Sequence, residues 1–156
     1  MKFKPALLIG ASIIAVLVLA ACGGSSPATP SFTAVEANGV KIVNVVFAKN
    51  ITKDMVAENP GPVFKPTDTI YTLVSIEGRP KSGKITAKYY YQSQYLTEAT
   101  YDLADINSGV IISIGQVTYT DFYLTHEQAL PVSKEYNVEL YVDDTKVGDY
   151  PFEIAQ

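Results

Sequence analysis

The segment at residues 136–142, YNVELYV, decides the fold class because its apolar and polar side chains alternate. In an extended strand, the even positions from Tyr136 to Val142 point to one face, and Asn137 and Glu139 point to the other. This period of two is typical of a β-strand with one buried face and one face in water. The segment therefore predicts a half-buried strand rather than a helix.

A second alternating segment lies at residues 84–91, KITAKYYY. Its predicted inward side chains are Ile85, Ala87, Tyr89 and Tyr91. After the first segment, Asp143 and Asp144 supply turn chemistry, and a last strand at 147–154 returns with Phe152 and Ile154 inward. The two segments and the returning strand indicate a sheet whose strands are far apart in the sequence.

The remainder of the chain is also rich in strand patterns. Further strands are predicted at residues 40–48, 69–76, 95–101, 110–117 and 120–124. A single helical turn is predicted at 52–57 with Thr52 as its N-cap, and a hairpin loop is predicted at 78–83. Seven or eight short strands separated by turn residues predict an all-β protein with an antiparallel β-sandwich.

Residues 64–71, 135–142 and 150–154 resemble the immunoglobulin-like domains of bacterial surface lipoproteins. The resemblance covers residues 36–156 and implies an immunoglobulin-like sandwich. The chain has no Trp and only one Cys, so the Cys, Trp, Cys trio of antibody domains is absent. Tyr136 stands where a tyrosine corner would bond its hydroxyl to nearby backbone. The fold alone implies no activity.

The first 21 residues have the layout of a secretory signal peptide. Lys2 and Lys4 precede an unbroken run of apolar or small residues at 6–21. A membrane-spanning helix is the alternative, but it needs about 20 apolar residues. We therefore expect a signal peptide at 1–21 that is cleaved in the mature protein.

The segment Leu19-Ala20-Ala21-Cys22 resembles the lipobox of bacterial lipoproteins. That resemblance implies that the thiol of Cys22 carries a lipid and that Cys22 is the first mature residue. Residues 22–35 then form a flexible linker rich in Gly, Ser and Pro, which reaches about 20 Å from the lipid. The expected location is extracytoplasmic, anchored to the bacterial cell membrane or the outer membrane.

The charge of the mature chain argues against one class of partner. Removing Lys2 and Lys4 leaves 10 basic and 16 acidic residues and a formal charge of −6. Nucleic acid needs a basic footprint, so no nucleic-acid partner is expected. Because Cys22 is the only cysteine, the domain must also fold without a disulfide.

No segment assembles a set of catalytic or metal-binding residues. The loop from Asp102 to Gly109 resembles a calcium loop in part, but its glycine and its expected Glu are misplaced, so a turn is favoured and the binding of Ca²⁺ stays open. His126 is the only histidine, and a zinc site needs several His or Cys ligands. No cofactor and no metal are therefore expected.

Tyrosine is unusually frequent, with 11 in the chain. Its flat ring and polar tip suit glycan stacking or protein recognition, although strands also favour aromatic residues for packing alone. Tyr90 and Tyr141 have the opposite parity from their inward neighbours. They are the predicted ligand-binding residues.

These observations favour a non-enzymatic module that binds an envelope protein or a glycan outside the membrane. One alternative is an envelope hydrolase that uses carboxylates such as Asp102 and Asp105 around His126. A second alternative is a structural accessory subunit. Pairing of His126 with acidic groups in a pocket would distinguish the hydrolase from the binding module.

Overall fold

The computed structural model describes residues 32–105 and 108–156. The predicted signal peptide, Cys22 and most of the predicted linker lie outside these residues. Within the described ranges the chain forms β-strands and no helix. The described part of the chain accordingly offers no helix long and apolar enough to cross a membrane.

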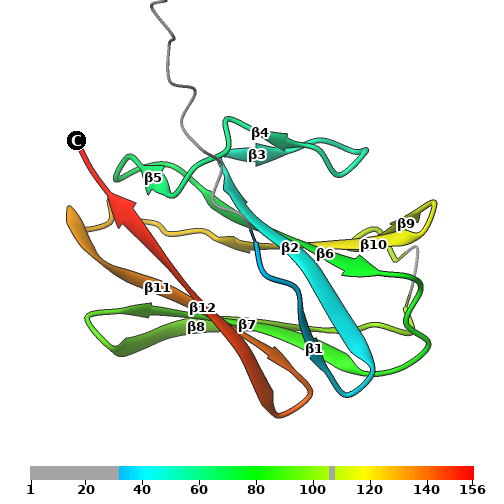
Figure 1. The fold of residues 1–156 in the computed structure, drawn as a ribbon. Helices are drawn as coiled ribbons and strands as arrows, with labels where there is room; N and C mark the ends of the chain where they lie inside the picture. Colours follow the sequence, from blue (N-terminus) through cyan, green and yellow to red (C-terminus); the bar gives the residue numbers. More distant parts are fainter. Residues whose placement is uncertain (1–31, 106–107) are drawn as a thin grey trace, which may run out of the picture. The chain divides into compact units, whose positions relative to one another are not determined.

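Two five-stranded sheets make up most of the domain (Figure 1). Sheet 1 has the spatial order β1 (Val35–Ala37), β2 (Val40–Ala48), β6 (Ile70–Glu77), β10 (Val117–Leu124) and β9 (Ile111–Ile114). Sheet 2 has the order β5 (Val63–Phe64), β12 (Thr145–Ile154), β11 (Ser133–Val142), β7 (Lys84–Tyr91) and β8 (Gln94–Asp102). The predicted all-β sandwich is confirmed.

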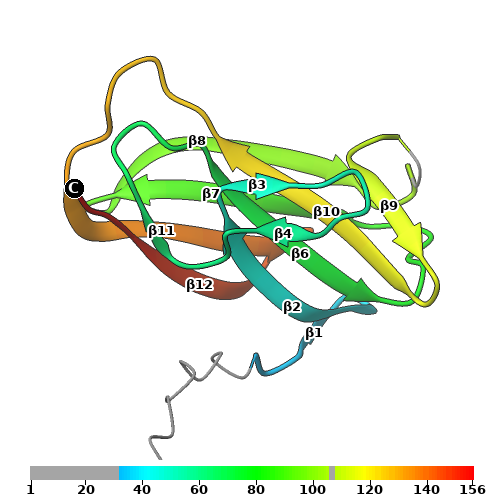
Figure 2. The ribbon, with the colours of Figure 1, turned by 90° about the horizontal axis from the view of Figure 1, so that it is seen from above.

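All strand pairs are antiparallel except the short pairing of β5 with β12. The remaining strands, β3 (Asn50–Ile51) and β4 (Ala57–Glu58), form a two-stranded sheet. Figures 1 and 2 place this small sheet on the outer side of sheet 1. It leaves the outer side of sheet 2 free of further strands.

The core lies between the inner faces of the two sheets and follows the alternation of the sequence. The predicted inward side chains are buried, except for the half-buried Tyr91: Ile85, Ala87, Tyr89, Tyr136, Val138, Leu140, Val142, Phe152 and Ile154. Burying each large apolar side chain contributes about 1.5–3 kcal/mol. The predicted parity of β7, β11 and β12 is thus confirmed.

Aromatic rings join the two sheets at one end of the core. The ring of Phe152 on β12 lies 5.5 Å from that of Phe47 on β2 and 5.2 Å from that of Tyr136 on β11. Tyr136 also stacks on Tyr91, with ring centroids 4.6 Å apart. These contacts connect strands of both sheets.

Two tyrosine hydroxyls make polar contacts within the fold. The hydroxyl of Tyr136 donates to the backbone oxygen of Pro131 at 2.9 Å, which confirms the predicted bond to nearby backbone. The hydroxyl of Tyr89 on β7 lies 3.0 Å from Oγ1 of Thr72 on β6, and both residues are buried. The second bond crosses the core from one sheet to the other.

Three local predictions were wrong. Residues 52–56 form a turn, in which Oγ1 of Thr52 accepts a bond from the Val56 amide at 3.1 Å, and Ala57 begins a strand. The single strand predicted at 110–117 is a hairpin, because Gly115 adopts a positive φ of 63° and turns the chain between β9 and β10. Residues 78–83 connect two different sheets rather than two strands of a hairpin.

The strand count was also underestimated. The described residues contain twelve strands rather than seven or eight, because β1, β3, β4 and β5 have only two or three residues each. Strands this short cannot display a repeating pattern. The eight predicted segments otherwise correspond to the long strands of the two sheets, with the difference at 110–117 described above.

The bond between Thr72 and Tyr89 gives a test of the core. Tyr89→Phe removes the hydroxyl and leaves the buried Oγ1 of Thr72 without this partner, so we expect a loss of about 1–3 kcal/mol in the free energy of unfolding. Thr72→Val combined with Tyr89→Phe should cost less than the two single substitutions added together. Chemical denaturation measures all four proteins, and strictly additive losses would contradict the bond.

Candidate binding face

The outer side of sheet 2 carries both predicted ligand-binding tyrosines. Because Tyr89, Val138 and Leu140 point into the core, their neighbours on β7 and β11 must point outward. Tyr90 pairs with Asn137, and Tyr141 pairs with Thr86. Both tyrosines are half-buried and lie on one face, which we call the outer face.

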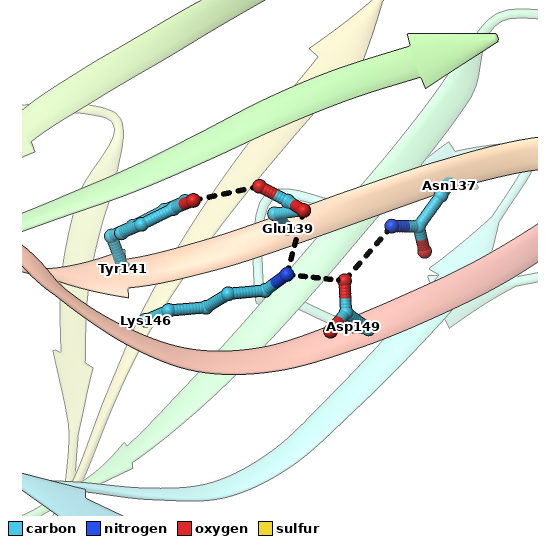
Figure 3. A network of polar contacts seen from close by, with 5 residues as sticks. All are labelled: Asn137, Glu139, Tyr141, Lys146 and Asp149. Carbon is cyan, nitrogen blue, oxygen red and sulfur yellow. Dashed lines mark hydrogen bonds and ion pairs between the residues drawn. The ribbon is translucent and has the colours of Figure 1, made fainter. Parts of the chain in front are cut away.

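A network of polar contacts occupies the middle of the outer face (Figure 3). The hydroxyl of Tyr141 donates to Glu139 at 2.7 Å, and Nζ of Lys146 lies 2.6 Å from the other oxygen of that carboxylate. Lys146 also lies 2.8 Å from Asp149, which accepts a bond from the Asn137 amide at 3.0 Å. This network links β11 to β12 and fixes the orientation of the Tyr141 ring.

Lys88 of β7 lies between this network and β8. Its ammonium group is 4.9 Å from the centre of the Tyr141 ring and 3.4 Å from the carboxylate of Glu98. A cation over an aromatic face is attracted by the ring electrons. Lys88 therefore contacts an aromatic ring and a carboxylate at the same time.

The charges of the network shift the titration of its members. The hydrogen bond to Glu139, together with burial, raises the pKa of Tyr141 to about 12. The bonds from Lys146 and Tyr141 lower the pKa of Glu139. Burial raises the pKa of Tyr90, and the nearby charge of Glu139 raises it further. Glu139 thus influences both predicted tyrosines.

Tyr95 is a third tyrosine of the outer face, and sequence reasoning did not select it. Tyr89 pairs with Thr97, but its neighbour Tyr90 pairs with Tyr95, so Leu96 is an extra residue in β8. Without this β-bulge, Tyr95 would share the inward parity of Thr97. Its ring lies 6.0 Å from that of Tyr90 at 76° and is 56% exposed.

Two shallow hollows lie on the same face. The first is lined by Tyr90, Gln92, Ser93, Glu135, Tyr136, Asn137, Glu139 and Pro151. The second is lined by Lys84, Thr86, Lys88, Glu98, Thr100, Tyr141, Asp143 and Asp144. Most of these side chains are polar, so the face suits a ligand that forms many hydrogen bonds.

His126 is placed away from both hollows. Its Nδ1 lies 2.7 Å from the backbone oxygen of Gln128, and its Nε2 lies 3.0 Å from that of Asp68. The Nε2 contact joins the loop after β10 to the segment before β6, and the Nδ1 contact lies within that loop.

Asp102 and Asp105, the residues suggested for a hydrolase, make hydrogen bonds within their own turn. Asp102 accepts a bond from the Ala104 amide at 2.9 Å, and its backbone oxygen accepts one from the Asp105 amide at 3.1 Å. Residues 106–107 of the predicted calcium loop lie outside the described residues. In the part of the chain that the structure describes, no three His, Cys, Asp or Glu side chains are grouped to hold a metal ion.

Comparison with known proteins does not place the domain in a family. No family model and no curated protein matches the chain. The chemistry of the outer face is consequently the basis for the functional argument.

The pKa of Tyr141 tests the geometry of the network. Glu139→Gln removes the anionic acceptor that favours the protonated phenol, so the pKa of Tyr141 should fall from about 12 toward its ordinary value of about 10. An NMR titration of the Tyr141 ring measures the change. Glu98→Gln is the matched control and should leave this pKa in place. An equal shift of the Tyr141 pKa in both variants would contradict the hydrogen bond between Tyr141 and Glu139.

Proposed function

We propose that this protein is a lipid-anchored, non-enzymatic binding module of the bacterial envelope. Cys22 holds it to the cell membrane or the outer membrane, and the outer face binds an extracytoplasmic protein or glycan. The observation that carries the proposal is the gathering of Tyr90, Tyr95 and Tyr141 on one side of sheet 2. Tyrosines concentrated in this way are typical of recognition surfaces.

The order of segments along the chain supports the anchor. The apolar run at 6–21 is followed by Cys22, and the Gly, Ser and Pro residues follow Cys22. The first strand begins at Val35, where the linker was expected to end. Gly- and Ser-rich composition is typical of a linker between an anchor and a domain.

The strand order supports an immunoglobulin-like sandwich. Without the short strands β1 and β5, sheet 1 reads β2-β6-β10-β9 and sheet 2 reads β12-β11-β7-β8. This is the order of immunoglobulin sheets ABED and GFC, with β8 as an additional strand beside C. Tyr136 lies in β11, the equivalent of strand F, and makes the expected backbone bond.

The contacts of His126 favour binding over hydrolysis. A general base needs a nitrogen free to take a proton from a nucleophile. Both nitrogens of His126 instead face backbone oxygens. The outer face is therefore the better candidate for contact with a ligand.

The anchor is tested by Cys22→Ala. Without the thiol, the mature protein should lose its lipid, so it should no longer incorporate radiolabelled palmitate and should shift from the membrane fraction to a soluble form or an uncleaved precursor. Cell fractionation and labelling measure both effects. Palmitate labelling that survives the substitution would refute lipidation at Cys22.

The outer face is tested by binding to isolated envelopes. Soluble mature protein carrying Cys22→Ala should co-sediment with envelope material, and Tyr90→Ala together with Tyr95→Ala should weaken the apparent affinity at least fivefold, because two aromatic contacts worth about 0.5–1.5 kcal/mol each are lost. Tyr123→Ala is the matched control, because Tyr123 is 52% exposed on sheet 1. Equal losses in both proteins would contradict a role for the outer face.

A further inference from the structure

An uncharged row of side chains crosses the outer face from strand to strand. Pro151 of β12 pairs with Asn137, Asn137 pairs with Tyr90, and Tyr90 pairs with Tyr95 of β8. We call these four residues the uncharged row. With strands about 4.8 Å apart, the row extends about 14 Å across the sheet. The bulge at Leu96 completes it, because it brings Tyr95 to this side.

Most charged residues beside the row are paired with one another, and Glu135 accepts a bond from the Gln92 amide at 2.8 Å. Lys146 lies between Glu139 and Asp149, which leaves this cluster with a net negative charge, and Lys88 contacts Glu98. A charged ligand would have to break these pairs or add a like charge to the network, and either change reduces its gain. The arrangement of charge therefore favours an uncharged ligand.

The two rings at the end of the row form a corner. Tyr90 and Tyr95 meet at 76°, so one ring presents its face where the other presents its edge. Tyr95 is 56% exposed and stands on the edge strand of the sheet. Aromatic faces with polar tips bind the C–H surface of a sugar ring and leave its hydroxyls free for hydrogen bonds.

The first hollow lies along the row and offers these hydrogen bonds. Two amides, Gln92 and Asn137, and two carboxylates, Glu135 and Glu139, are among its lining residues. Its described lining contains no Lys, Arg or His. Carboxylates accept hydrogen bonds from hydroxyls, and they repel anionic groups.

We infer that the ligand of the outer face is an uncharged glycan that lies across the strands along Pro151, Asn137, Tyr90 and Tyr95. This inference rests on the proposed function and names its ligand class. A sugar ring stacks in the corner of the two tyrosines. The following sugars extend over Asn137 toward Pro151, and their hydroxyls donate to the acceptors of the hollow.

The experiment titrates soluble mature protein carrying Cys22→Ala with neutral hexasaccharides, namely cellohexaose, xylohexaose, mannohexaose and chitohexaose. At least one should bind, with NMR shifts in the rings of Tyr90 and Tyr95. Tyr95→Ala should weaken this binding about twofold to tenfold, because an aromatic contact is lost. Asn137→Ala should also weaken it, whereas Tyr123→Ala should leave it unchanged.

A heparin hexasaccharide, a polylysine peptide and a polyproline peptide are the competing probes. If none of the neutral glycans binds, or if they bind equally well to Tyr95→Ala, the inference is overturned. Sensitivity of envelope binding to Tyr90 and Tyr95 would then still support the proposed function, and a competing probe that shifts these two rings would identify another ligand class. If the substitutions of Tyr90 and Tyr95 also leave envelope binding unchanged, the proposed function fails as well. Circular dichroism and thermal unfolding confirm that each variant is folded.

Discussion

The packing of the two inner sheet faces is the contact on which the domain depends. The chain has one cysteine, Cys22, so no disulfide within the chain can join the sheets. Aromatic contacts such as Phe47 with Phe152, and the bond between Thr72 and Tyr89, connect the sheets instead. A domain of this size therefore relies on close packing where many small secreted domains rely on cross-links.

The same packing positions the outer face. Successive side chains of a strand point to opposite sides, so burying Tyr89, Val138 and Leu140 obliges their neighbours to face outward. The pairing of β7 with β11 then sets Tyr90 beside Asn137. A shift of this register by one residue would send the outer side chains into the core, which the burial of apolar side chains prevents. The outer face is thus held by the stability of the core beneath it.

The sequence predicted the long strands and their inward residues well, and its failures share one cause. A helical turn was predicted at 52–57 because Thr52 can act as an N-cap, yet residues 52–56 form the turn that connects β3 to β4. The hairpin at Gly115 was missed because apolar residues flank the turn on both sides. In both places, pairing between two short strands closes a hairpin where the local pattern predicted one continuous element.

The sequence by itself determined the alternation of side chains, the absence of a disulfide, and the selection of Tyr90 and Tyr141 as outward tyrosines. Only the tertiary structure decided which side chains meet. Tyr95 joins Tyr90 because one extra residue in β8 reverses its side, and Lys146 bridges Glu139 and Asp149 because β12 folds back along β11. Alternation is a property of one strand, whereas register and bulges belong to the pairing of two, and that pairing forms only when the strands meet across the sheet.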